Sequence, residues 1–333
     1  MSRIDHITII QIILTLPVCF LLTKLAIIAA KKYGFISNPN PIVENHKIPV
    51  AFGGGIAIGM TIIIFLIFQS FNYQQALKFI LIILPVIVIG LMDDIFEFTP
   101  FVKLGLEALS VLPFIFFYIN VPGAYLAIFL LFILISQNSW NMVDIMDGLV
   151  SGISFIIFLS VGIILLPITE LEFYSILSFA IAISSLGFRF LNMAPAKIFL
   201  GETGSLLLGT LFSFILINVY LVDKITAYFL VLLGSVPFFE LFFLVIVRSR
   251  KGISIYKKSP DHFALRMLHN GYSVQTINRK VILASAINSL IIIVSIIFSA
   301  NFFVLLICLS LILLGASFAF VYFQSLPVKE SKV

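Results

Sequence analysis

Asn138-Ser-Trp-Asn141-Met-Val-Asp144-Ile-Met-Asp147-Gly148 lies between two long apolar runs, at 121–137 and 149–167. Amide and acid side chains recur there at every third residue, and residues three apart on a helix share one face. A polar face at membrane depth is costly unless it lines a water-filled cavity or binds a ligand. Interhelical hydrogen bonding would use such groups too, but it needs fewer of them. The stretch therefore predicts membrane helices with a site between them.

The composition supports a membrane protein. The chain is 61% hydrophobic and only 11% charged, with 36 Phe among 333 residues, and its mean hydropathy is +1.20. Cys19 and Cys308 each lie inside an apolar run, so neither a disulfide framework nor a cysteine metal site is expected. The first apolar run lacks the features of a cleaved signal peptide and is interpreted as a retained span. The net charge of +5 gives no argument for nucleic acid.

A bilayer core takes roughly 20 apolar residues per helix. We expect an all-α, polytopic membrane protein that forms one domain over residues 1–333. About eleven spans are expected from this length criterion. They lie at about 7–30, 50–69, 77–92, 101–119, 121–137, 149–167, 172–190, 204–222, 225–247, 281–299 and 302–323.

The basic residues are distributed unequally between the two sides of the expected membrane spans. Of the 20 Lys and Arg residues, only Arg3, Lys78 and Lys224 fall on one side of these spans. The positive-inside rule then places the N-terminus outside and the C-terminus in the cytoplasm. Most acids also fall on the cytoplasmic side, which favours an enzyme with a cytoplasmic substrate over a pore. We expect the active site in the inner loops, at about 31–50, 92–103, 137–149, 189–205 and 248–280.

The first two inner loops carry groups suited to phosphate chemistry. His46-Lys47-Ile48-Pro49 is followed by Gly53-Gly54-Gly55, where glycines allow close approach of a ligand or, as favoured for this loop alone, close helix packing. Asp93-Asp94 ends an apolar helix, and such a pair suits metal–phosphate or general-base chemistry. Lys103 could meet a phosphate, or it could pair with Glu107 four residues on.

The later inner loops add a cation site, an anion site and a basic segment. Asn141 and Asp144 could bind a metal or a nucleoside. Gly201-Glu202-Thr203-Gly204-Ser205 opens an apolar helix, where free N–H groups and the helix dipole attract anions. Glu202 at this place suits a divalent cation that holds a phosphate, although an ordinary N-cap is equally compatible. The last loop is rich in Lys and Arg and could bind anionic lipid or clamp a diphosphate.

Taken in this order, the motifs resemble the polyprenyl-phosphate N-acetylhexosamine-1-phosphate transferases, a resemblance that covers about residues 31–280. It implies transfer of a sugar 1-phosphate from a UDP-sugar, UDP-GlcNAc by default, to undecaprenyl phosphate with release of UMP. It implies Mg²⁺ as cofactor, with Mn²⁺ as a substitute. It also implies a multi-pass protein of the bacterial inner membrane whose active site faces the cytoplasm.

The resemblance also assigns roles to individual residues. Asn141 and Glu202 would bind the metal, and Asp93, Asp94 and Lys103 would be catalytic. The substrate contacts would come from His46, Lys47, Asn138, Asp144, Asp147, Asn192, His262 and Arg266. The expected partners are the UDP-sugar, undecaprenyl phosphate, membrane lipids and, in a homodimer, a second copy of the chain.

Three departures from the family pattern leave the sugar open. Glu202 stands where Asp is usual, Ile145 stands where Gly commonly follows the first Asp, and Asp261-His262-Phe-Ala-Leu-Arg266 replaces a run of several His residues. UDP-MurNAc-pentapeptide is the alternative donor. The competing functions are a secondary transporter, a CDP-alcohol-type phosphotransferase and a non-catalytic relative that binds lipid phosphate.

Overall fold

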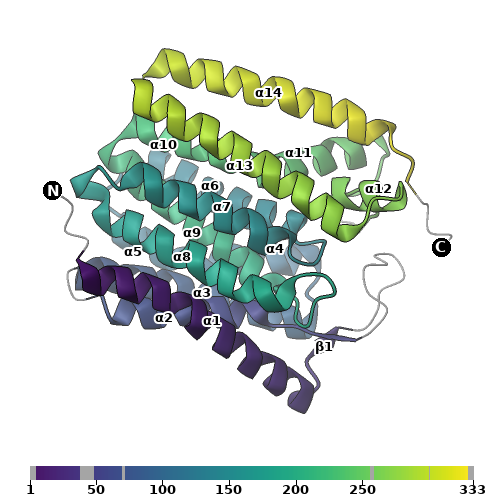
Figure 1. The fold of residues 1–333 in the computed structure, drawn as a ribbon, viewed down its shortest axis with the longest axis horizontal. Helices are drawn as coiled ribbons and strands as arrows, with labels where there is room; N and C mark the ends of the chain where they lie inside the picture. The colour runs from purple at the N-terminus through teal and green to yellow at the C-terminus, as the bar shows by residue number, and fades with distance from the viewer. Residues whose placement is uncertain (1–4, 38–48, 70–71, 256–258, 300, 329–333) are drawn as a thin grey trace.

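The computed structural model describes residues 5–37, 49–69, 72–255, 259–299 and 301–328. These residues form a bundle of helices whose long axes run broadly in one direction (Figure 1). The helices are α1 His6–Tyr33, α2 Gly54–Ile67, α3 Tyr73–Phe96, α4 Pro100–Ser110, α5 Leu112–Phe117, α6 Gly123–Val143, α7 Leu149–Leu165, α8 Glu172–Asn192, α9 Gly201–Val222, α10 Lys224–Leu233, α11 Ser235–Arg250, α12 Phe263–His269, α13 Val274–Ser299 and α14 Phe302–Ser325, with a 3-10 turn at Thr169–Leu171.

The all-α membrane fold expected from the sequence is confirmed at the level of helices and apolar length. Eight helical segments of the described chain are long and apolar enough to cross a membrane, and a ninth is the pair α10–α11, bent by 64° at Gly234. The shorter apolar helices α2 and α7 occupy the remaining two expected spans. The start of α1 and the end of α14 lie at opposite ends of the bundle (Figure 1). Eleven crossings and the orientation in the membrane stay predictions.

Helix α9 is the centre of the bundle. It packs against α2, α3, α6 and α10, while α8 packs against α1, α2 and α7. In both α8 and α9, 83% of the most apolar stretch is buried, against 11% in α14 at the edge. Polar groups at the start of α9 are therefore held among packed helices.

Two glycines bring α2 and α3 close to the start of α9. A Cβ atom on Gly55 would lie 2.1 Å from the backbone nitrogen of Gly204, and one on Gly90 would lie 2.5 Å from the Cα of Thr203. Neither position has room for a side chain. Gly55 thus serves helix packing, the interpretation favoured for its loop alone.

A small sheet and one bridge join the loop before α2 to the loop before α9. Strand β1, Ile36–Ser37, pairs antiparallel with β2, Val50–Ala51. Ala51 also forms a parallel bridge with Ile198, in the segment that leads to α9. The loops before α2 and before α9 are thereby fixed to each other at the same end of the bundle.

Candidate active site

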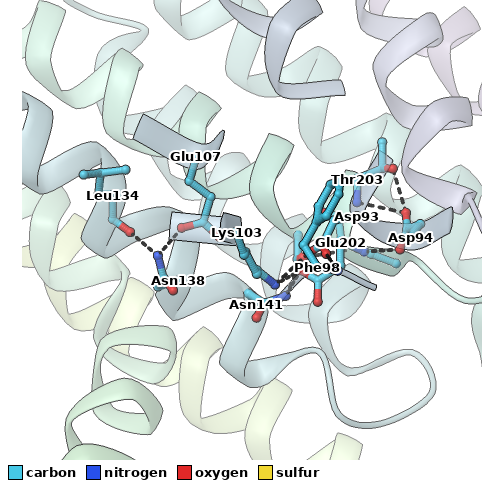
Figure 2. A network of polar contacts seen from close by, with 12 residues as sticks. Asp93, Asp94, Phe98, Lys103, Glu107, Leu134, Asn138, Asn141, Glu202 and Thr203 are labelled. Atoms are coloured by element: carbon cyan, nitrogen blue, oxygen red, sulfur yellow. Dashed lines mark hydrogen bonds and ion pairs between the residues drawn. The ribbon is translucent and has the colours of Figure 1, made fainter. Parts of the chain in front are cut away.

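Asp94 is bound to the start of α9. Its Oδ1 accepts a hydrogen bond from the Glu202 N–H at 2.8 Å. Its Oδ2 accepts one from the Thr203 N–H at 3.1 Å and one from Thr203 Oγ1 at 2.7 Å (Figure 2). The free N–H groups and the dipole of a helix start favour such an anion. The sequence predicted an anion site here, and the anion in the structure is the protein's own Asp94.

Lys103 joins the acid pair to Glu202. Its Nζ lies 2.5 Å from Glu202 Oε2 and 3.2 Å from Asp93 Oδ2. Asp93 is buried, and its Oδ1 accepts a hydrogen bond from the Phe98 N–H at 2.9 Å. Of the two expectations for Lys103, pairing with Glu107 is wrong, because the ammonium pairs with Asp93 and Glu202. Contact with a phosphate stays a prediction.

Asn138 and Asn141 project from the last turns of α6. The Asn141 amide donates to Glu202 Oε2, the same oxygen that accepts Lys103, and also to Ser205 Oγ at 3.3 Å. Asn138 donates to Glu107 Oε2 at 2.8 Å (Figure 2). The two residues assigned to the metal, Asn141 and Glu202, are therefore in direct contact.

The polar face formed by Asn138 and Asn141 does not continue along α6 as far as Asp144. Helix α6 stops at Val143, and Asp144 follows as its C-terminal cap, so Asp144 and Asp147 lie in the turn before α7. This turn falls within the loop expected at about 137–149. Asp147 Oδ2 accepts a hydrogen bond from the Ala196 N–H at 2.9 Å, which ties this turn to the loop before α9.

Asp144 sits in an unfavourable place for a negative charge. Desolvation raises its pKa well above the ordinary range, and the charges of Glu202, Asp94 and Asp147 act in the same direction. A hydrogen bond from the Gly201 backbone opposes the shift. The carboxylates around the start of α9 thus exceed the positive charge that Lys103 supplies, which is a condition that favours binding of a cation.

Asn192 and Ile145 shape the turn before α7. Asn192 is buried, and its Oδ1 accepts hydrogen bonds from the Gly148 N–H and from Ser151 Oγ, both at 3.0 Å. Its Nδ2 donates to the Ile198 carbonyl at 3.0 Å. Ile145 packs against the hydrophobic core. Among the described residues other than glycine, only Glu97 has a positive φ, so the backbone at Ile145 does not require the glycine usual in the family.

His262 and Arg266 belong to a second polar cluster, at the end of α11. His262 Nδ1 lies 2.8 Å from Glu240 Oε1, and Arg266 Nη2 donates to Asp261 Oδ1 at 2.8 Å. Arg266 Nη1 donates to the carbonyls of Phe323 and Leu326, at the end of α14. These contacts brace the last loop against the C-terminal helices.

Asp261 is stabilised as an anion within this second cluster. Burial would raise its pKa, but the hydrogen bonds of Lys251 and Ser259 and the charges of Lys251 and Arg266 hold the pKa below the usual value. The Nε, Nη1 and Nη2 atoms of Arg266 all donate to acceptors within the chain. The substrate contacts expected of His262 and Arg266 stay predictions, as do those of His46 and Lys47, which lie outside the described residues.

Mg²⁺ fits the donor chemistry at Glu202. Within the described ranges, no three His, Cys, Asp or Glu side chains converge closely enough to hold a metal by themselves. Mg²⁺ is commonly bound through one or two carboxylates, while waters and substrate phosphates complete its shell. Glu202 supplies a carboxylate, and Asn141 supplies an amide oxygen once its amide rotates, because Nδ2 now faces Glu202.

Two residues of this site were missed in the sequence. Thr203 holds Asp94 through both its N–H and its hydroxyl. Glu107, interpreted from the sequence only as a surface partner of Lys103, is 1% exposed and accepts the hydrogen bond of Asn138. In the sequence, Glu107 could be noticed only because it lies four residues after Lys103 on a helix. That spacing indicated Lys103 as its partner, whereas the partner in the structure is Asn138.

Comparison with known proteins gives a family match. The family model "Glycosyl transferase family 4" matches residues 76–220. This range contains Asp93, Asp94, Lys103, the stretch from Asn138 to Gly148, and Glu202. It ends before the last loop with His262.

Similar proteins come from several bacteria. The undecaprenyl-phosphate alpha-N-acetylglucosaminyl 1-phosphate transferase of Thermotoga maritima is 29% identical over 248 residues, which are 73% of this chain and 74% of that protein. The phospho-N-acetylmuramoyl-pentapeptide-transferase of Listeria welshimeri is 27% identical over 292 residues, 76% of this chain and 88% of the relative. A probable undecaprenyl-phosphate N-acetylglucosaminyl 1-phosphate transferase of Bacillus subtilis is 27% identical, with 77% of this chain and 76% of the relative covered.

Proposed function

We propose that this chain, whose residues 76–220 match glycosyl transferase family 4, transfers a sugar 1-phosphate from a UDP-sugar to undecaprenyl phosphate. An oxygen of the acceptor phosphate attacks the phosphorus attached to the sugar. The bridging P–O bond of the donor breaks, and UMP leaves with that oxygen. The single observation that carries the proposal is the junction of Asp93, Lys103, Asn141 and Glu202 at the start of α9, built by α3, α4, α6 and α9.

The residues around this junction have different roles in positioning the reacting groups. Asp94 fixes the first turn of α9 and with it the backbone of Glu202. Lys103 offers an ammonium that reaches Asp93 and Glu202 together, and it is the group placed to meet a phosphate. Phosphoryl transfer depends mainly on such positioning and on charge stabilisation.

Mg²⁺ bound by Glu202 and Asn141 would neutralise charge on the donor diphosphate. Both oxygens of Asp94 are held by the start of α9, whereas Asp93 Oδ2 meets the Lys103 ammonium, the group placed to meet a phosphate. Asp93 is therefore the better candidate to act beside the acceptor phosphate. Asp144 and Asp147, in the turn next to Glu202, are candidates for contact with the uridine or the sugar.

The donor sugar is proposed to be GlcNAc, with MurNAc-pentapeptide as the second candidate. Relatives of similar identity carry each of the two names. The first loop, at about 31–50, lacks the extended basic and His-rich form expected of the muramyl-pentapeptide enzymes, which supports the smaller donor. The site is proposed to face the cytoplasm of a bacterial inner membrane, where a UDP-sugar is available.

A reconstituted assay tests the proposal. The purified full-length protein is incubated with undecaprenyl phosphate, Mg²⁺ and each UDP-sugar, and both UMP release and lipid-linked product are measured. We expect turnover with one HexNAc donor, loss of turnover in Glu202→Ala, and normal turnover in Asp223→Asn, which keeps the helix cap of α10. Absence of turnover with every donor refutes the enzyme, and uptake of labelled sugar into vesicles without lipid product identifies a transporter.

A further inference from the structure

Glu107 is a buried carboxylate with an incomplete set of partners. It is 1% exposed, and its Oε2 accepts the hydrogen bond of Asn138. Within the part of the chain that the structure describes, its buried Oε1 has no hydrogen-bond partner. Burying a carboxylate oxygen without a donor is costly, so a second state in which Oε1 gains a partner would account for this residue.

Lys103 is a candidate for that partner. It lies one turn before Glu107 on α4, at the spacing that brings side chains together on a helix. Figure 2 shows Glu107 and Asn138 on one side of Lys103 and the Asp93–Glu202 pair on its other side. Both Lys103 and Asn141 donate to the same oxygen of Glu202. A divalent cation on that carboxylate would repel the ammonium and displace it.

We propose that the Lys103 ammonium occupies the cation site of the free protein and that Glu107 receives it when a divalent cation binds at Glu202. Glu107 is then a positioning residue that acts through Lys103. The inference rests on the proposed function, because it assumes that Glu202 binds a cation. It explains both the unpartnered Oε1 of Glu107 and the position of Lys103 between two acids.

Three variants separate this role from a structural one. Glu107→Gln keeps an oxygen that accepts from Asn138 but removes the charge that attracts Lys103. Lys103→Met removes the competing ammonium. The matched control is Glu172→Gln at the first turn of α8, since Glu172 is also buried with an unpartnered Oε1. Glu172 lies about 30 Å along α8 from Asn192, at 1.5 Å per residue.

The test measures binding of Mn²⁺ to the full-length protein in the absence of UDP-sugar. The EPR signal of free Mn²⁺ reports how much of the ion is bound. We expect Glu107→Gln to weaken binding about fivefold, the lower end of ordinary coupling between sites, and Lys103→Met to tighten it. Glu107→Gln added to Lys103→Met should change binding less than about twofold, as a double-mutant cycle requires when one residue acts through the other. Glu172→Gln should bind as the unmodified protein does.

Each contrary result has its own meaning. Equal weakening by Glu107→Gln in both backgrounds, or none in either, overturns the inference and leaves the proposed function standing. If Glu107→Gln does not fold, an unchanged affinity in Lys103→Met still overturns the claim that Lys103 occupies the site. If the unmodified protein binds no Mn²⁺, the inference falls with the metal site, and the turnover assay decides separately whether the transferase function falls too.

Discussion

Asp94→Asn tests whether the start of α9 must be held by a carboxylate. The carboxylate accepts three hydrogen bonds, at 2.8, 3.1 and 2.7 Å, from two backbone N–H groups and one hydroxyl. An asparagine has one accepting oxygen, so its amide nitrogen would face either the Glu202 N–H or the groups of Thr203. Helix α9 would then lose both its anion and at least one hydrogen bond at this end.

The size of the effect follows from these contacts. A buried donor left without an acceptor costs about 1–3 kcal/mol, and loss of a charge at a helix start costs about 0.3–1 kcal/mol. If this energy appears as displacement of Glu202, about 1.3–4 kcal/mol lowers kcat/KM by about 10- to 1,000-fold, since 1.36 kcal/mol is a factor of ten. Thr203→Val removes only the hydroxyl bond to this carboxylate and should cost about tenfold, at about 1.5 kcal/mol, the lower end for a hydrogen bond to a charged group.

The assay is UMP release over a range of Mg²⁺ concentrations, with thermal unfolding measured on the same samples. Thr203→Ser restores the hydroxyl and is the control, expected to be near the unmodified protein. We expect the order of activity to be Thr203→Ser, then Thr203→Val, then Asp94→Asn, with each variant folded. Unchanged kcat/KM in Asp94→Asn would refute the reasoning, because it would show that Glu202 does not depend on this anchor.

The helices could be predicted because their signal is local. Each apolar segment expected to span the membrane coincides with a helix or a helix pair, and the length of an apolar run is read directly from the chain. The end of α6 was not predictable in the same way. The spacing of Asn138, Asn141, Asp144 and Asp147 fits a helix throughout, but the chain turns after Val143 and Asp147 bonds to the loop before α9.

Partners of charged groups were harder to predict, because they come from distant segments. Asp94 and Thr203 are 109 residues apart, and Lys103 and Glu202 are 99 apart. The local rules predicted an open anion site on α9, and they offered Glu107 as one of two partners for Lys103. In the structure, Asp94 of α3 takes the start of α9, and Lys103 of α4 pairs with Asp93 and Glu202.

Three further predictions follow from the site. Glu202→Ala should abolish turnover, whereas Glu202→Asp should keep it within about tenfold, because Mg²⁺ needs a carboxylate more than a given length; UMP release distinguishes them, and loss in both would show a site built around Glu. Gly90→Ala should lower activity and melting temperature together, because its Cβ would lie 2.5 Å from the Cα of Thr203, and Gly105→Ala, with open space at the Cβ, is the control. Asp144 should make the metal-free protein less stable as the pH rises. Its folded pKa is raised, mainly by desolvation and also by three neighbouring acids, so between the ordinary value of about 3.9 and the raised one the folded state binds more protons than the unfolded state. Stability then falls as the pH increases through this window. Thermal unfolding measured against pH in EDTA should show the fall, and Asp144→Asn should flatten it; an equal slope in both proteins would exclude Asp144 as its source.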